Sequence, residues 1–154
     1  MRRCWHGRAF AALGRWVAGR SPARAQALAR RLVRLPWINA KRRRIAATNI
    51  ALCFPHLDDA AREALLADTL VSNTTGVLET LRGWFATPAQ LAGQAQIVGI
   101  EHLHAALAEG RGVVVVGAHY DGIELAMRHV ADASGQPMPI LVRRNNDPCI
   151  EAAI

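Results

Sequence analysis

The fold of this chain is decided by residues 113–124, which read VVVVGAHYDGIE. Four consecutive valines are typical of a strand that is buried on both faces of a parallel sheet. The residues after them turn the chain, and a helix is predicted over 121–133. The stretch therefore predicts a strand, a turn that carries His119, and a helix that carries Glu124 in its first turn.

The same alternation of strands and helices continues on both sides of this stretch. Short strands are predicted over 95–98 and 139–142, and a helix is predicted over 100–109 with Gly110 at its end. Strands that alternate with helices are typical of an α/β unit with parallel strands. Residues 58–154 are therefore predicted to form an α/β domain with a partial parallel sheet and flanking helices.

The remainder of the chain is predicted to be helical. The predicted helices cover residues 4–17, 22–35, 39–52 and 58–85. Ser21 precedes Pro22, so the second of these helices is predicted to begin with Ser21 as its N-cap. The polar run 72–76 weakens the longest helix, where a kink or a break is expected.

Positive charge is concentrated at one end of the sequence. Residues 1–57 hold thirteen basic residues and no acidic one, whereas residues 58–154 hold six basic and twelve acidic residues. A basic segment attracts polyanions, which here are nucleic acid, an anionic membrane surface or an acidic carrier protein. Nucleic acid is the least favoured, because the basic run 41–44 belongs to no nucleic-acid-binding motif. We therefore divide the chain into a basic helical membrane-proximal region, 1–57, and an α/β domain, 58–154.

The first two predicted helices combine arginines with tryptophans and leucines, a composition typical of helices that lie in a membrane interface. An ordinary amphipathic helix of a soluble protein shows the same pattern, so both interpretations stay open. The apolar stretches are interrupted by Arg8, Arg15 and Arg20, and no secretory signal is predicted. A transmembrane helix needs about 20 mostly apolar residues, and the sequence contains no such run.

The three cysteines, Cys4, Cys53 and Cys149, lie far apart in the sequence. Their spacing matches neither a zinc site nor a redox pair. An odd number of unpatterned cysteines is typical of a reducing compartment, so three inert thiols are expected. The histidines also predict no metal site, because His102 and His104 cannot share one face of a helix.

His119 and Glu124 are the candidate catalytic residues. In an open α/β sheet, ligands bind beyond the carboxyl ends of the strands, which is where His119 is expected. A carboxylate holds an imidazole in one orientation and stabilises its protonated form, so the pair can take a proton from a hydroxyl that attacks an acyl group. An alternative stays open: Asp121 and Glu124 have the spacing of a capping box, and His119 is then only a polar loop residue.

Four segments carry a resemblance to a known family. They are Gly-x-His-Tyr-x-x-x-Glu-Leu at 117–125, the block from the arginines at 43–44 to Cys-Phe-Pro at 53–55, Glu-Thr at 79–80 with Trp-Phe at 84–85, and Gly-Ile-Glu-His-Leu at 99–103. Each of these motifs is short, and a short motif alone has many false matches. In this order, however, they resemble the lipid A late acyltransferases, the lauroyl and myristoyl transferases, over about residues 40–151.

The resemblance implies an enzyme that moves an acyl group from an acyl carrier protein thioester to a hydroxyl of a lipid A precursor or a related lipid. It makes His119 the general base, Glu124 its partner and Arg143 a substrate-binding residue. The Tyr-Arg-Pro context of the family's arginine is absent around Arg143. The resemblance implies neither a cofactor nor a metal, and it places the protein peripherally on the cytoplasmic face of the inner membrane.

Members of this family are longer, so the chain is expected to be the N-terminal half of a glycerolipid-acyltransferase-like fold, truncated after the second core strand. The alternative is an inactive fragment or remnant that binds an anionic membrane surface through its basic helices. A half of this kind is expected to leave a sheet edge and apolar helix faces uncovered.

Overall fold

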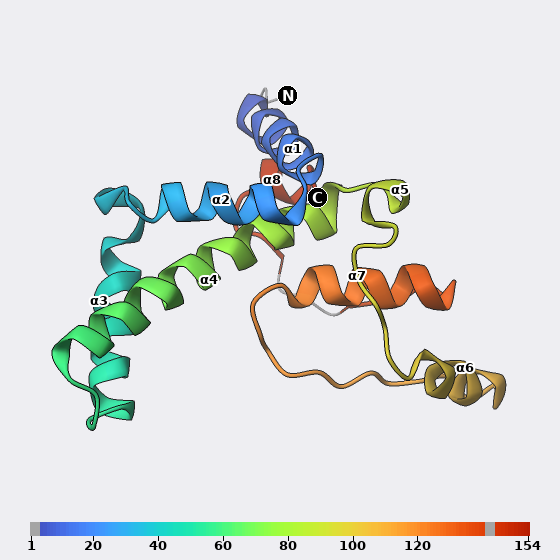
Figure 1. The fold of residues 1–154 in the computed structure, drawn as a ribbon. Helices are drawn as coiled ribbons and strands as arrows, with labels where there is room; N and C mark the ends of the chain where they lie inside the picture. The colour runs from blue at the N-terminus through green and yellow to red at the C-terminus, as the bar shows by residue number, and fades with distance from the viewer. Residues whose placement is uncertain (1–3, 141–143) are drawn as a thin grey trace. The chain divides into compact units, whose positions relative to one another are not determined.

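The computed structural model describes residues 4–140 and 144–154, and of residues 36–39 it describes the backbone alone. Helices and the loops between them make up the described chain (Figure 1). The chain divides into two compact units. Unit 1 consists of Met1–Gly19 and Glu79–Ile154, and unit 2 consists of Arg20–Leu78.

The described residues form eight helices. They are α1 Trp5–Ala18, α2 Pro22–Leu32, α3 Pro36–Cys53, α4 Asp59–Phe85, α5 Pro88–Leu91, α6 Ile100–Ala108, α7 Ile123–Ser134 and α8 Pro148–Glu151. Ser21 caps α2 as predicted, because its side chain accepts a hydrogen bond from the Arg24 amide. The predicted break in α4 is not found, because the helix runs through residues 72–76 without interruption.

Unit 2 is held together by a small apolar cluster and by polar contacts between α3 and α4. Ile50, Leu66 and Leu70 are buried in this cluster, and the partly buried residues around them are Val33, Ala46, Ala47 and Leu65. Leu66 and Leu70 are four residues apart, so they share one face of α4. Arg43 Nη2 on α3 lies 2.5 Å from Glu63 Oε1 on α4, which makes an ion pair. Apolar burial and this ion pair therefore connect the two helices within unit 2.

Unit 2 also carries much of the positive charge, with ten basic and four acidic residues. The basic run Lys41–Arg44 is exposed on α3, and Arg42 Nη1 donates a hydrogen bond of 2.6 Å to Asn73 Oδ1. Of the helices that the structure describes, none combines the length and the apolar character needed to cross a membrane. The functional division of the chain between residues 57 and 58 remains a prediction.

Unit 1 has its own apolar cluster, which is built from residues far apart in the sequence. Ala18, Ala86, Leu91 and Leu125 are buried in it, and Phe85 packs against it. These residues come from the end of α1, the end of α4 and the residue after it, α5, and the start of α7. The cluster therefore ties the beginning of the chain to the segment that follows α4.

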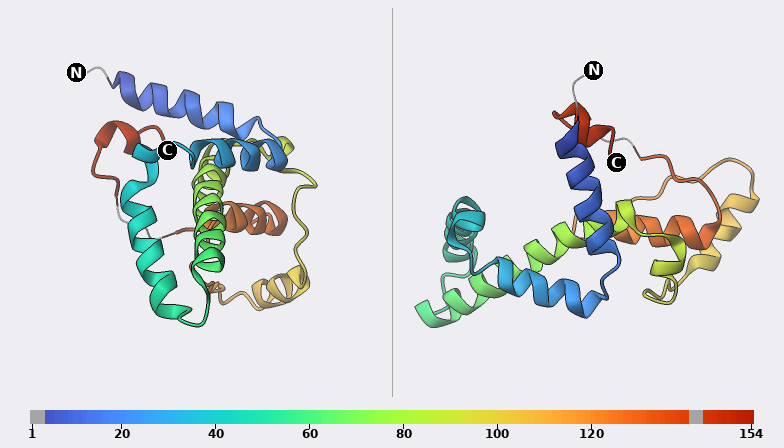
Figure 2. Two further views of the ribbon diagram at one scale, coloured as in Figure 1. Left: turned by 60° about the vertical axis from the view of Figure 1, so that its left-hand side comes forward. Right: turned by 90° about the horizontal axis from the view of Figure 1, so that it is seen from above.

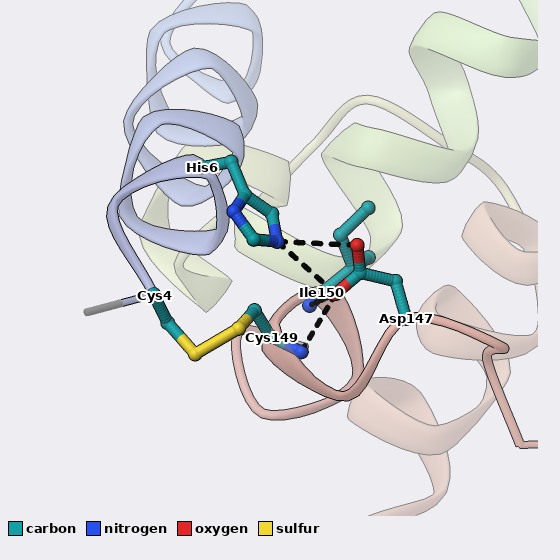
Figure 3. Close-up of a disulfide and its surroundings, with 5 residues drawn as sticks. All are labelled: Cys4, His6, Asp147, Cys149 and Ile150. Carbon is teal, nitrogen blue, oxygen red and sulfur yellow. Dashed lines mark hydrogen bonds and ion pairs between the residues drawn. A yellow bond between two sulfur atoms is a disulfide. The ribbon is translucent and has the colours of Figure 1, made fainter. Parts of the chain in front are cut away.

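A disulfide joins the two ends of unit 1 (Figure 3). Cys4, which precedes α1, is bonded to Cys149 in α8, and their Cα atoms are 5.3 Å apart. Beside this bond, the hydrogen bond from His6 lowers the pKa of the Asp147 carboxyl. The prediction of three inert thiols is therefore wrong in this structure, where Cys53 is free and exposed. The paired cysteines are 145 residues apart, a separation that no short spacing rule covers.

The prediction of an α/β fold with a partial parallel sheet is wrong, because the described residues contain no strand (Figure 2). The valine run lies in the long loop between α6 and α7. Val114 and Val116 are each 89% exposed, whereas Val113 and Val115 are 37% and 43% exposed. This alternation is that of an extended chain, but a strand also needs hydrogen bonds from a neighbouring strand. No described segment supplies them.

The other two predicted strands differ from the structure in the same way. Residues 95–98 are irregular, and the segment 139–142 reaches into residues 141–143, which lie outside the described part of the chain. The glycerolipid-acyltransferase-like sheet is therefore not found in the described residues. The helices predicted beside these strands do form, because a helix makes its hydrogen bonds within itself, whereas a strand depends on distant residues.

Candidate active site

His119 lies in the loop between α6 and α7, three residues before Gly122, the N-cap of α7. Its side chain is exposed, and so is that of Tyr120, at 78%. The Tyr120 amide donates a hydrogen bond of 3.0 Å to the Ala118 carbonyl, which turns the backbone at the histidine. The loop therefore presents the imidazole to solvent near the start of α7.

Glu124 lies in the first turn of α7 and is half-buried. Its Oε2 atom accepts a hydrogen bond of 3.0 Å from the Thr80 hydroxyl on α4. The capping-box alternative is not found, because the N-cap of α7 is Gly122 and no side chain caps the helix. Glu124 is thus held by a residue 44 positions earlier in the sequence rather than by its own helix start.

Two glycines allow the end of α4 to lie close to the start of α7. Gly122 has φ +75°, a conformation that L side chains rarely adopt, and a Cβ atom there would collide with Glu79 Oε2. A Cβ atom on Gly83 would lie 3.1 Å from the Leu125 amide nitrogen and 3.2 Å from the Glu124 carbonyl carbon. A larger side chain at Gly83 would press on the backbone of Glu124 and Leu125, whereas at Gly122 it would meet only the flexible end of the Glu79 side chain.

Arg82, on the same part of α4, is buried, with 2% of its surface exposed. It donates a hydrogen bond to the Gln94 side chain, while its Nε atom has no hydrogen-bond partner within the described residues. Burial lowers the pKa of the guanidinium, and the charge of Glu79 opposes this shift. The charges of Arg82 and Glu79 therefore interact on α4, and Glu79 also approaches Gly122 at the start of α7.

The structure thus places the predicted site residues only in part. His119 and Glu124 belong to the same short segment, but among the described residues no hydrogen bond or ion pair joins them. Arg143 lies outside the described residues. The catalytic roles of all three residues remain predictions.

Sequence reasoning missed the role of Thr80. The Glu79-Thr80 pair forms part of the family resemblance, yet nothing in the sequence assigns either residue to the site. In the structure, Glu79 approaches Gly122 and Thr80 donates to Glu124. The signal that pointed to these residues was the motif itself, because the contact spans too many residues to follow from local spacing.

Two largely apolar cavities lie beside the motif. One has a volume of about 450 Å³, and its walls include Leu103, Val113, Val115, Ile123 and Met138. The other has a volume of about 650 Å³ and is lined by residues that include Glu124, Trp84, Met127 and Arg128. The Glu124 carboxylate therefore borders an apolar space.

The chain was compared with known protein families, and the family model described as bacterial lipid A biosynthesis acyltransferase matches residues 4–154. The chain belongs to this family. The match includes the loop with His119, the start of α7 and the end of α4. The family predicted from the four sequence motifs is therefore confirmed.

Curated relatives of this acyltransferase family agree with the assignment. The lipid A biosynthesis lauroyltransferase of Escherichia coli (strain K12) is 29% identical over 111 residues, which are 72% of this chain and 36% of the relative. The lipid A biosynthesis palmitoleoyltransferase of the same strain is 32% identical over 111 residues, which are also 72% of this chain and 36% of the relative. A lipid A biosynthesis acyltransferase of Haemophilus influenzae is 27% identical over 114 residues, which are 74% of this chain and 35% of the relative.

The chain therefore spans little more than a third of the length of these acyltransferase relatives. No solved structure matches it. The alignment with the lauroyltransferase covers 72% of this chain, so most of the chain has a counterpart in that relative.

Proposed function

We propose that the chain takes part in acyl transfer from an acyl carrier protein thioester to a hydroxyl of a lipid A precursor or a related lipid. The proposal rests on the family match together with the positions of His119 and Glu124 around the start of α7. His119 lies in the loop before α7, and Glu124 in the first turn of α7 is fixed by Thr80 at the edge of an apolar cavity.

In the proposed reaction, His119 acts as the general base. The acceptor hydroxyl attacks the thioester carbonyl carbon while His119 takes its proton, and a C–O bond forms. Glu124 orients the imidazole and stabilises the imidazolium that results. Amide groups at the start of α7 are suited to stabilise the negative oxygen of the tetrahedral intermediate. The C–S bond then breaks, and the carrier sulfur takes the proton from His119 and leaves as a thiol.

The apolar cavities suit a fatty acyl chain. The cavity that Leu103, Ile123 and Met138 help to line has a volume of about 450 Å³, within the roughly 300–1,000 Å³ typical of ligand pockets. In the proposed complex, the acyl chain occupies this apolar space, and the thioester lies near the loop that carries His119. Arg143 is proposed to bind a phosphate of the acceptor, as the family resemblance implies.

Unit 2 is proposed to hold the protein at the cytoplasmic face of the inner membrane as a peripheral protein. Its excess of basic over acidic residues attracts anionic lipid, and it also attracts the acidic acyl carrier protein. The exposed run Lys41–Arg44 is its densest group of positive charges. Neither a cofactor nor a metal has a role in the proposed transfer step.

The test measures acyl transfer from an acyl carrier protein thioester to a lipid A precursor. His119→Ala is expected to lower the rate at least about 100-fold, since a general base contributes roughly 10²–10⁴-fold. His104→Ala is the matched control, because His104 is exposed on α6 and lines neither of the two cavities beside the motif, so its loss should leave the rate unchanged. Wild-type transfer by the His119→Ala variant would refute the assignment.

A second candidate function is that of an inactive remnant that binds anionic membranes, and the charge of unit 2 favours it. Flotation with anionic vesicles in the absence of any acyl transfer would support this candidate over the first. Arg44→Glu is expected to weaken vesicle binding, since each basic residue near an anionic surface contributes about 1 kcal/mol. Equal binding to neutral and anionic vesicles would contradict it.

A further inference from the structure

Four side chains of the types that bind transition metals converge where α1 and α8 meet in unit 1 (Figure 3). Cys4 and Asp147 are the N-cap residues of α1 and α8, and His6 and Cys149 lie in the first turns of these helices. The ligand atoms of His6, Asp147 and Cys149 all lie within 4.8 Å of one another, and the sulfur of Cys4 is bonded to that of Cys149. Each cysteine is thus two residues from an imidazole or a carboxylate.

We propose that the reduced chain binds one zinc ion at this place, through two thiolates, the imidazole of His6 and the carboxylate of Asp147. The disulfide is then the oxidised, metal-free form of the same site. A dithiol reductant supplies two electrons and two protons to the Cys4–Cys149 bond and itself becomes a disulfide. The two new thiols lose their protons when the metal binds.

The distances suit a tetrahedral zinc site. Zinc lies about 2.3 Å from thiolate sulfur and about 2.0–2.2 Å from imidazole nitrogen or carboxylate oxygen, so its ligands lie roughly 3.3–3.8 Å from each other. His6 Nε2 already lies 3.1 Å from Asp147 Oδ2. Reduction lets the two sulfurs move apart to the required separation by rotation of their side chains. The ion therefore needs no rearrangement of the helices.

The surroundings also orient the carboxylate. Asp147 Oδ1 accepts hydrogen bonds from the amides of Cys149, at 2.8 Å, and Ile150, at 3.3 Å, at the start of α8. These bonds fix the side chain with both carboxylate oxygens near His6 Nε2, Oδ1 at 3.2 Å and Oδ2 at 3.1 Å. Hydrogen bonds of this kind, made to a ligand from outside the site, orient the ligands of known metal sites.

The site is also open to an ion and to a reductant. The side chains of His6 and Asp147 are 42% and 41% exposed, and they border a cavity of about 790 Å³ together with both cysteines. A disulfide alone requires no imidazole and carboxylate beside it. In a reducing compartment the bond is expected to open. A bound zinc ion then links α1 to α8 in place of the disulfide.

The test is a titration of the full chain with Co²⁺, a spectroscopic substitute for zinc, after reduction and removal of metals with a chelator. One Co²⁺ per chain is expected, with a thiolate-to-cobalt absorption band and the visible bands of tetrahedral cobalt, and Zn²⁺ should displace it. Cys53→Ser is the matched control and should bind equally, because Cys53 is a free cysteine of unit 2. The oxidised chain should give no thiolate band.

Cys149→Ser, His6→Ala and Asp147→Asn are each expected to weaken Co²⁺ binding by at least roughly 100-fold, the upper end of what outer-shell changes cost. The last two variants keep both cysteines, so their fold can be verified by formation of the disulfide before reduction. Absence of a thiolate band in the reduced wild-type chain overturns the proposal. A band that is unchanged in the His6→Ala and Asp147→Asn variants also overturns it.

Discussion

Unit 2 and unit 1 are assembled in different ways. Unit 2 is one continuous segment, Arg20–Leu78, and its cluster is formed by helices that follow one another in the sequence. Unit 1 combines both ends of the chain, and it depends on the Cys4–Cys149 bond and the Thr80–Glu124 hydrogen bond, which span 145 and 44 residues. Local patterns therefore account for unit 2, whereas a few distant contacts determine the geometry of unit 1.

Charge divides the two units as well. Unit 2 has ten basic and four acidic residues, whereas unit 1 has nine basic and eight acidic residues. The motif with His119 and Glu124 belongs to the nearly neutral unit. In the proposed function, unit 2 therefore supplies the long-range attraction to anionic partners, and unit 1 supplies the reacting groups.

The largest expected effect comes from breaking the distant covalent contact of unit 1. Under oxidising conditions, Cys4→Ser is expected to lower the free energy of unfolding of unit 1 by about 2–5 kcal/mol, as is typical when a native disulfide is lost. Denaturant unfolding measures the loss of free energy. Hydrogen exchange of the α1 and α2 amides shows which unit is affected. Cys53→Ser should change stability by less than about 0.5 kcal/mol. Equal loss of protection in α1 and α2 would contradict separate assembly of the two units.

A substitution in the apolar cluster of unit 2 tests whether unit 2 can be destabilised without an effect on unit 1. Leu70 is 5% exposed, so Leu70→Ala is expected to destabilise unit 2 by about 3 kcal/mol through lost burial and the cavity that remains. Hydrogen exchange should accelerate in α3 and leave α7 unchanged. Leu52→Ala is the control, because Leu52 on α3 is 73% exposed and its loss should have little effect.

A smaller effect is expected where α7 begins. Gly122→Ala is expected to cost about 1–2 kcal/mol for the left-handed backbone conformation, and a small further amount because the Glu79 carboxylate must move away from the new Cβ atom. Gly110→Ala is a matched control, because Gly110 has φ +72° and open space around its Cβ position. The difference in unfolding free energy between these variants measures the contact with Glu79. Equal effects would show that the Glu79 carboxylate does not rest against Gly122.

The smallest expected effect comes from the hydroxyl that holds Glu124. Thr80→Val is expected to lower acyl transfer by roughly 3- to 10-fold, in line with the 0.5–1.5 kcal/mol that a typical hydrogen bond contributes. Thr75→Val is the control, because the Thr75 hydroxyl donates to the Val71 carbonyl within α4. Equal rates in the two variants would show that the Thr80 hydroxyl has no part in positioning Glu124.

The sequence was sufficient to predict most helices and the family. The predicted helices over 4–17 and 58–85 differ from α1 and α4 by at most one residue at each end, because apolar spacing acts within one helix. The family followed from four short motifs in order. These predictions rest on features that lie close together in the sequence.

The predictions that failed concern contacts between distant segments. The run Val113–Val116 favours an extended chain, and the chain is extended there, but no described segment pairs with it. The Cys4–Cys149 bond and the role of Thr80 were missed for a related reason. Each of these contacts joins residues that lie far apart in the sequence, and neither residue alone indicates its partner. Composition and spacing carry no direct information on such pairs.

The central claim is that His119 and Glu124 act as one unit in acyl transfer. The most direct test compares the rate of transfer in the wild-type chain, His119→Ala, Glu124→Gln and the double variant. If the account holds, Glu124→Gln lowers the rate at least about tenfold when His119 is present, and it has almost no further effect when His119 is absent. An equal loss in both backgrounds would show that the two residues act independently and would contradict the account.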